Sequence, residues 1–347
     1  MGVISAKEIM TIKVNLSSGS HSEGRGVGFY AQFLSESLKK EKGIELTDKN
    51  PDLIHYPFFD LFYPTLPFKK IVPTVVTIHD LTPLVLSSLY PRGVKSSINL
   101  LRQWLSLQSV SAVITDSVNS KQDLVKIFKL SPKKVFVTPL SVNPIYSQSP
   151  SSKKISAVKK KYSLPDKFVL NVSAGPNPNK NLPALAQATQ DLNIPLIIAG
   201  GGVAKPAPSG KVHPELKDLA ELKKYSHVIT PGFVPNEDLL VFYKLASLYC
   251  QPSLYEGFGL PVLEAMNAGC LVVSSHVSSL PEIYSRNTIT FSPRDLEGMK
   301  QALNHALHLT AKKKAALIKE AKKKADDFDW KKTAQATIKI YRSVLGK

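Results

Sequence analysis

The stretch QPSLYEGFGLPVLEAMNAGCLVVSS, residues 251–275, decides the fold of this chain, because it joins a glycine turn, a helix and a strand. An apolar run just before it suits a buried strand, and Gly257 and Gly259 free the backbone to turn. Pro261 suits the first turn of a helix, and Gly269 is a typical helix stop. The apolar run that follows predicts a second strand, so the segment is a strand–loop–helix–strand unit.

This unit presents two carboxylates, Glu256 in the loop and Glu264, which we expect in the first helical turn. In a parallel sheet such a loop lies at the carboxyl edge, where α/β folds bind ligands. The backbone amides of Phe258, Gly259 and Leu260 are predicted to point at an anion or at hydroxyl groups. Because carboxylates accept hydrogen bonds from hydroxyl groups, the segment predicts a site for a sugar attached to a diphosphate.

The motif EGFGLPVLEAMNAG, residues 256–269, resembles the signature of the retaining GT-B glycosyltransferases of family 4, also called glycosyltransferase group 1. The resemblance implies that Glu256 contacts the transferred sugar and that Glu264 holds the nucleotide ribose. It also implies that the amides of residues 258–260 bind hexose hydroxyls and phosphate. Without the resemblance, Glu264 could be only a helix-end charge and Glu256 a solvated loop residue.

Composition predicts a soluble globular protein, since 347 residues with 43% apolar side chains suffice for two domains. We expect no secretory leader and no membrane span, because no apolar run reaches about 18 residues. Cys250 and Cys270 both lie in apolar, strand-like runs, which predicts free buried thiols, a reducing cytoplasm and no zinc site.

Strands and helices alternate along the whole chain, which predicts the α/β class with parallel sheets. We expect two doubly wound, Rossmann-like domains facing a cleft, which is the GT-B architecture. The expected divisions are an acceptor-side domain at 1–150, a linker at 151–165, a nucleotide-sugar domain at 166–328 and a helix at 329–347 that crosses back to the first domain. The expected strands are 12–16, 53–55, 72–79, 112–115, 135–138, 168–172, 196–199, 228–229, 246–250 and 271–274.

A glycine loop, GRGVG at residues 24–28, precedes a helix expected at 29–40. The amides of Gly26 and Gly28 are candidates to approach a diphosphate, although a flexible surface turn has the same pattern. The loop follows its strand by about eight residues, whereas a dinucleotide-binding fingerprint follows its strand almost at once. This spacing disfavours NAD.

Two further segments resemble the family, VVTIHDLTPL at 75–84 and NVSAGPNPNKNLPAL at 171–185. The resemblance implies that His79 contacts the donor sugar near the reacting carbon and that Lys180 neutralises the leaving diphosphate. Asn181 is predicted to be the N-cap of the following helix. Asn179 stands where the family has an arginine, so one phosphate-facing charge is missing or comes from another residue, such as Arg25.

Downstream, the segments IIAGGG at 197–202 and VITPGFVPNEDL at 228–239 resemble the family loops that frame the nucleotide base. Gly200, Phe233 and Val234 are therefore candidate donor-binding residues, with turn glycines and a core phenylalanine as the structural alternative. The segment HVSSLPEI at 276–283 resembles the loop that follows the glutamate pair in the family.

The implied reaction is transfer of a hexose, with mannose favoured, from a nucleoside diphosphate sugar to a hydroxyl group, with retention at the anomeric carbon. GDP-mannose is the favoured donor, with dTDP-rhamnose and UDP-sugars as alternatives. The acceptor is expected to be a glycan or a lipid-linked glycan. We expect no metal cofactor, because a lysine and amide dipoles neutralise the leaving group and no Asp-x-Asp motif is placed to hold an ion.

The charge of the chain is strongly basic, at +18, and residues 1–165 carry 22 basic against 11 acidic residues. A basic nucleic-acid-binding protein would share this charge, but no nucleic-acid-binding signature accompanies it and we expect no nucleic-acid partner. A glycoside hydrolase using Glu256 and Glu264 is the other alternative. Residues 90–108 combine basic and apolar side chains, which predicts either a core-packed helix or an interfacial helix of a cytoplasmic protein that binds an anionic membrane surface.

Overall fold

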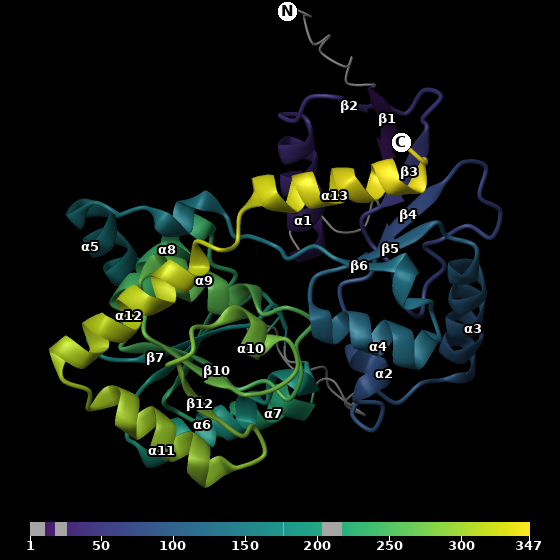
Figure 1. The fold of residues 1–347 in the computed structure, drawn as a ribbon. Helices are drawn as coiled ribbons and strands as arrows, with labels where there is room; N and C mark the ends of the chain where they lie inside the picture. Colours follow the sequence, from purple (N-terminus) through teal and green to yellow (C-terminus); the bar gives the residue numbers. More distant parts are fainter. Residues whose placement is uncertain (1–10, 18–25, 176, 203–216) are drawn as a thin grey trace, which may run out of the picture. The chain divides into compact units, whose positions relative to one another are not determined.

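The computed structural model describes residues 11–17, 26–175, 177–202 and 217–347. The chain divides into two compact units (Figure 1). Unit 1 comprises residues 1–81, 92–140 and 329–347, and unit 2 comprises residues 82–91 and 141–328. The segment 82–91 thus belongs to unit 2, although we expected it in the first domain. The expected linker at 151–165 contains a helix and also lies in unit 2.

Unit 1 contains a six-stranded parallel sheet with the strand order β2-β1-β3-β4-β5-β6. Its strands are β1 (Ile12–Leu16), β2 (Ile44–Leu46), β3 (Leu53–Tyr56), β4 (Thr74–Thr77), β5 (Ala112–Thr115) and β6 (Val135–Val137). Its helices are α1 (Gly26–Leu38), α3 (Val94–Gln108), α4 (Val118–Phe128), the short 3-10 helix η1 (Pro132–Lys134) and α13 (Trp330–Val344).

The order of the strands in unit 1 decides which face of the sheet each helix covers. The chain steps one way from β1 through α1 to β2, and the opposite way from β4 through α3 and α4 to β6. Since such crossovers are right-handed, α1 covers one face and α3 and α4 the other. The buried side chains of Tyr30, Leu34 and Leu38 recur at helical spacing and attach α1 to the sheet.

Helix α13 packs across α1 on the same face of unit 1, as Figure 1 shows in yellow. The Trp330 ring stacks on the Phe33 ring, with centroids 5.4 Å apart and an 18° angle between the planes. At the other end of α13, the Tyr341 hydroxyl hydrogen-bonds to Nδ1 of His55 over 2.6 Å. The last helix of the chain therefore completes the unit that contains the first strand.

Unit 2 contains a second six-stranded parallel sheet, with the order β12-β11-β10-β7-β8-β9. Its strands are β7 (Val169–Val172), β8 (Leu196–Ala199), β9 (Val228–Gly232), β10 (Leu248–Gln251), β11 (Val272–Ser275) and β12 (Ile289–Phe291). Its helices are α2 (Thr82–Val85), η2 (Pro144–Ser147), α5 (Ser152–Lys161), η3 (Pro178–Lys180), α6 (Leu182–Asp191), α7 (Lys217–Leu222), α8 (Asn236–Leu245), α9 (Leu260–Ala268), α10 (Leu280–Ile283), α11 (Leu296–Leu307) and α12 (Ala311–Ala325).

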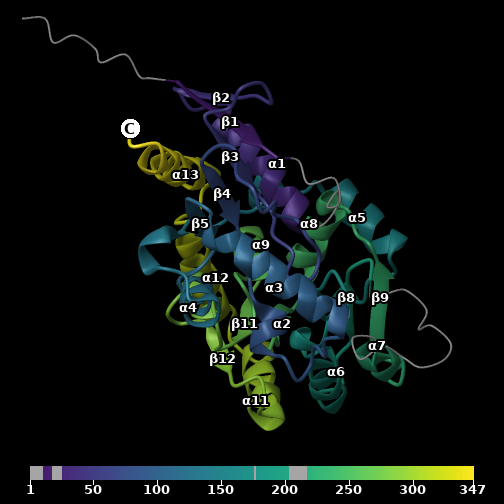
Figure 2. The same cartoon turned by 90° about the vertical axis from the view of Figure 1, so that its right-hand side faces the viewer.

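The direction of chain progression in unit 2 reverses between β7 and β10, which are neighbours in the sheet. From β7 the chain proceeds outward to β8 and β9, and from β10 it proceeds outward to β11 and β12, as the separation of β9 and β12 in Figure 2 illustrates. Such a switch point opens a crevice at the carboxyl ends of the two central strands. We therefore expect a ligand site at the loops after β7 and β10.

Candidate functional site

The Glu256 carboxylate is held in place by three side chains of unit 2. Its Oε1 accepts hydrogen bonds from Gln251 Nε2 at 2.8 Å and from Ser253 Oγ at 2.6 Å. The Lys180 ammonium lies 2.7 Å from Oε1 and 3.0 Å from Oε2. Because Lys180 follows β7 and Glu256 follows β10, this ion pair bridges the switch point of the sheet. The sequence predicted both residues for the site but not their direct contact.

Asn179 and Asn181 support this loop in ways that the sequence did not predict. Buried Asn179 donates from Nδ2 to the Tyr255 carbonyl at 2.9 Å and accepts from the Tyr90 hydroxyl at 2.6 Å. It therefore orients the backbone beside Glu256. Asn181 occupies the N-cap position of α6, but its side chain makes no capping bond. The predicted cap was wrong in this respect, because its amide donates to the carbonyls of Pro252 at 3.2 Å and Pro293 at 2.8 Å.

The start of α9 depends on Gly259, whose φ of +116° is rarely adopted by other residues. A Cβ there would lie 2.7 Å from Cδ2 of Leu280. Pro261 lies in the first turn of α9 and Gly269 ends the helix in the left-handed conformation, as the sequence predicted. Among the hydrogen bonds of the described residues, none is donated by the amides of Phe258, Gly259 or Leu260. These amides are therefore available to an anion or to hydroxyl groups.

Two serines that the sequence analysis did not single out hold this loop from the other side. Ser278 Oγ accepts from the Glu256 amide at 2.8 Å. Ser279 Oγ is within hydrogen-bond distance of the carbonyls of Glu256, at 2.9 Å, and Phe258, at 2.7 Å. The feature of the sequence that indicates these serines is the pair of hydroxyl residues in HVSSLPEI, close to the end of β11.

Glu264 follows Glu256 in the sequence and lies in α9, where its side chain is buried in unit 2. It is the fifth residue of α9, so the prediction that placed it in the first helical turn was wrong. Its Oε2 accepts a hydrogen bond from the Tyr243 hydroxyl at 2.9 Å. Burial raises the pKa of Glu264 to about 7, although the Tyr243 hydrogen bond opposes the shift. A ligand that donates hydrogen bonds would therefore favour ionisation of this carboxyl group.

The loops after β8 and β9 contain the residues predicted to frame a base. A Cβ on Gly200 would lie 1.6 Å from the Ser173 carbonyl oxygen, so only glycine allows this close approach of two strand ends. Phe233 is 71% exposed, which excludes the alternative that it is a core phenylalanine. The side chain of Val234 is buried, so only its backbone is available to a ligand.

His79 lies in unit 1, just after β4, and pairs with an aspartate that the sequence analysis missed. Its Nδ1 lies 2.7 Å from Oδ2 of Asp116, which follows β5, and its Nε2 lies 3.3 Å from the Pro57 carbonyl. Burial disfavours the charged ring, but Asp116, with smaller contributions from Asp80 and the Pro57 carbonyl, outweighs burial and raises the pKa of His79. The signal for Asp116 was its position directly after the buried strand β5, and His79 likewise lies close behind the end of β4.

The glycine loop before α1 is only partly within the described residues. Gly26 is the first residue of α1 and Gly28 lies in its first turn. The helix therefore begins before the predicted residue 29 and ends at Leu38 instead of residue 40. Gly24 and Arg25 lie outside the described residues, so Arg25 as the replacement for the family arginine stays a prediction.

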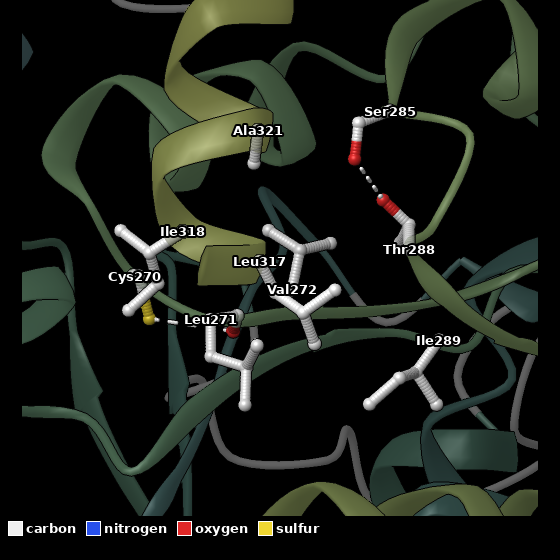
Figure 3. Close-up of a pocket in the computed structure, with 9 residues that line it drawn as sticks. All are labelled: Cys270, Leu271, Val272, Ser285, Thr288, Ile289, Leu317, Ile318 and Ala321. Carbon is white, nitrogen blue, oxygen red and sulfur yellow. Dashed lines mark hydrogen bonds between the residues drawn. The ribbon is translucent and has the colours of Figure 1, made fainter. Parts of the chain in front are cut away.

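Two pockets stand out among the described residues, and neither is lined by Lys180 or Glu256. Figure 3 shows one in unit 2, lined by residues at the amino ends of β11 and β12 and by α12, with a volume of about 10 Å³. Its hydroxyl pair, Ser285 and Thr288, is hydrogen-bonded over 3.1 Å. The space suits a single water-sized molecule at the edge of the sheet opposite to the ligand edge. The other pocket, of about 400 Å³, lies in unit 1 beside α3.

Cys250 and Cys270 are both free and buried, as predicted. No helix within the described ranges is long and apolar enough to cross a membrane. Across those same ranges, no three His, Cys, Asp or Glu side chains gather as metal ligands.

Comparison with known proteins gives two family matches. The model for "Glycosyl transferases group 1" matches residues 154–324, and the model for "Glycosyltransferase Family 4" matches residues 18–145. Together the two matches extend over most of the sequence of both units.

Curated relatives and solved structures agree with these families. The serotype-specific mannosyltransferase WbdA of Escherichia coli is 28% identical over 90% of this chain, which spans 39% of the length of WbdA. The O-antigen chain mannosyltransferase B of Escherichia coli is 28% identical over 86% of this chain and 76% of its own length. The solved structure of WaaG, a glycosyltransferase involved in lipopolysaccharide biosynthesis, matches with a TM-score of 0.67 at 14% identity, covering 97% of this chain and 99% of WaaG.

Proposed function

Since this chain is a family 4 glycosyltransferase with the GT-B fold, we propose that it transfers mannose from GDP-mannose to a hydroxyl group of a glycan or lipid-linked glycan, with retention at the anomeric carbon. The observation that carries the proposal is the Lys180–Glu256 pair beside the amides that begin α9. The mannosyltransferase relatives support mannose as the transferred sugar. The family matches leave no support for a glycoside hydrolase or a nucleic-acid-binding protein.

The loop around Glu256 suits a leaving diphosphate. Breaking the glycosyl–phosphate bond increases negative charge on the phosphate, so preorganised positive groups there stabilise the transition state. Lys180 supplies a full charge, and the amides of residues 258–260 lie at the positive end of α9. Lys180 is able to turn toward a phosphate without leaving Glu256 unsatisfied, because Gln251 and Ser253 also donate to that carboxylate.

Glu256 and Glu264 would then bind hydroxyl groups. Within the described part of unit 2, Oε2 of Glu256 accepts a hydrogen bond from Lys180, whereas Gln251 and Ser253 donate to Oε1, so Oε2 is able to accept from a hexose hydroxyl as well. Glu264 would accept from the ribose, and the exposed ring of Phe233 would stack on the base. His79 stays a candidate sugar contact, with Asp116 orienting its ring.

A donor panel tests the proposal. The chain is incubated with GDP-mannose, dTDP-rhamnose, UDP-glucose or UDP-N-acetylglucosamine and a mannose-terminated oligosaccharide, and the products are analysed by mass spectrometry and by NMR of the anomeric proton. We expect addition of one hexose from GDP-mannose, in the α configuration of the donor. Transfer from a UDP-sugar alone would refute the mannose assignment, and an inverted anomer would refute retention.

Matched lysine variants test the role of the ion pair. Lys180→Gln should lower kcat by roughly 100-fold, as expected when a group that stabilises a developing charge is removed. Lys313→Gln removes the same charge from the exposed surface of α12 and should leave kcat unchanged. Activity that persists in EDTA would support the predicted independence of metal, and its loss with recovery on adding Mg²⁺ or Mn²⁺ would contradict that prediction.

A further inference from the structure

Helix α3 exposes a continuous apolar stripe to solvent. Val94 is 79% exposed, Ile98 and Leu101 are each 54% exposed, and Leu105 is 48% exposed. Their spacing of four, three and four residues places all of them on one side of the helix, and we call this set the α3 stripe. A stripe of this kind usually faces a protein core, whereas here it faces outward.

The opposite side of α3 packs on unit 1 through buried Gln103, Ser106 and Leu107. Gln103 Nε2 donates to the Asp60 carbonyl at 2.7 Å, and Ser106 Oγ donates to the Pro67 carbonyl at 2.7 Å. Both side chains are buried. Turning the stripe inward would break these hydrogen bonds and remove the Gln103 donor from the Asp60 carbonyl and from Thr65 Oγ1. The outward orientation of the stripe is therefore built into the fold.

The surroundings of the α3 stripe are basic. Helix α3 contains no acidic residue, and Arg92, Lys95 and Arg102 lie at its start and along it, all exposed. The Arg102 guanidinium lies 5.8 Å from the ring centroid of Phe68, which is 53% exposed. Both residues line the pocket of about 400 Å³ in unit 1, which gives a phosphate-bearing headgroup room beside the guanidinium.

We propose that the α3 stripe docks on an anionic lipid membrane, with α3 lying flat in the interface and Lys95 and Arg102 at the level of the phosphates. An apolar face bordered by cations suits the boundary between acyl chains and anionic headgroups. A second copy of this chain fits less well, since like charges would face each other across the contact. Helix α3 is labelled in Figure 2. This proposal does not depend on the identity of the donor.

Sedimentation with vesicles tests the proposal. The chain is mixed with vesicles of phosphatidylcholine alone, or of equal parts phosphatidylcholine and phosphatidylglycerol, and the bound fraction is measured at low and physiological salt. We expect binding only to the anionic vesicles. The double variant Ile98→Ser and Leu101→Ser should bind at least roughly 10-fold more weakly, because it removes apolar area from the membrane contact. The control Leu296→Ser alters an exposed leucine of α11 and should bind as the unaltered chain does.

A second pair of variants separates this surface from the general basicity of the chain. Lys95→Gln with Arg102→Gln should weaken binding more than Lys312→Gln with Lys313→Gln, although both pairs remove two charges. Equal weakening would overturn the proposal, as would equal binding to neutral vesicles or absence of binding. Analytical ultracentrifugation without lipid covers the remaining outcome: a dimer that the Ile98 and Leu101 changes dissociate would show that a second copy covers the stripe. Circular dichroism should show every variant folded, since the altered side chains are exposed.

Discussion

Glu264 is a buried carboxyl group whose ionisation should be linked to nucleotide binding. Burial raises the pKa of Glu264 to about 7 in the unliganded protein, above the ordinary value for glutamate. Ribose hydroxyls donate better to the ionised form, so binding should release a proton when the pH is below about 7. We expect the affinity for GDP to increase between pH 6 and 8, which calorimetry in buffers of different ionisation enthalpy measures. Glu264→Gln should weaken binding by roughly 1.5–3 kcal/mol and abolish this pH dependence.

Glu297→Gln provides the matched control for this prediction, because it makes the same chemical change at an exposed position of α11. It should bind GDP as the unaltered chain does. If Glu264→Gln retains the full affinity and the same pH profile, Glu264 does not hold the ribose.

At the scale of single elements, the loop that begins α9 depends on α10 and the residues just before it. Ser279→Ala would leave the buried carbonyls of Glu256 and Phe258 without their hydroxyl donor. We expect the free energy of unfolding to fall by roughly 1–3 kcal/mol. The affinity for GDP should fall by a larger fraction than the stability of unit 1 does. Urea unfolding and calorimetry check this result. Ser97→Ala, at an exposed position of α3, should change neither quantity. Equal effects of the two substitutions would contradict the role assigned to Ser279.

The attachment of α13 to unit 1 should be sensitive to acid. Burial lowers the pKa of His55 to about 3, with a smaller contribution from His79, while the side chain bonds Tyr341 and Thr77. Between about pH 6.5 and pH 3 the unfolded chain binds a proton at His55 that the folded chain does not. The contribution of His55 to the free energy of unfolding should therefore be highest above pH 6.5 and fall by up to about 1.4 kcal/mol per pH unit below it.

Urea unfolding at pH 7.5 and pH 5 measures this slope. His55→Gln should reduce the slope even if it lowers stability at both pH values. An NMR titration provides a second measurement that does not require the variant to fold, and protonation of His55 in the folded chain above pH 5 would contradict the prediction.

The sequence predicted most central strands, because buried β-branched runs between turn residues identify them directly. Strand β5 has the predicted bounds and β1 agrees as well. The edge strands β2 and β12 were not predicted, because their three-residue stretches, IEL and ITF, each contain a polar residue, whereas β6 is equally short but wholly apolar, VFV. The sequence also identified Lys180 and Glu256 separately. Their pairing, like that of His79 with Asp116, joins residues distant along the chain, so it depends on strand order that local patterns do not contain.

At the scale of the whole molecule, the two proposed surfaces belong to different units. The nucleotide candidates Lys180, Glu256 and Glu264 lie in unit 2, and the α3 stripe lies in unit 1. We expect GDP to slow amide hydrogen exchange in residues 173–181 and 252–264, and anionic vesicles to slow it in α3. Hydrogen exchange with mass spectrometry checks both results on one sample. Protection by GDP that appears in α3 but not in the loops of unit 2 would contradict the assignment of the donor site.

The position of α13 in the sequence affects how the chain folds as the ribosome makes it. Phe33 and His55 are among the first residues synthesised, but their contacts Trp330 and Tyr341 emerge only after all of unit 2. Nascent domains usually fold in order from the amino terminus, so unit 1 has to wait with part of its aromatic surface uncovered while unit 2 folds. A transcript truncated before residue 329 would therefore yield a protein with an intact sheet in unit 2 and an exposed aromatic surface on unit 1. Such an exposed surface makes the truncated protein a substrate for chaperones and proteases.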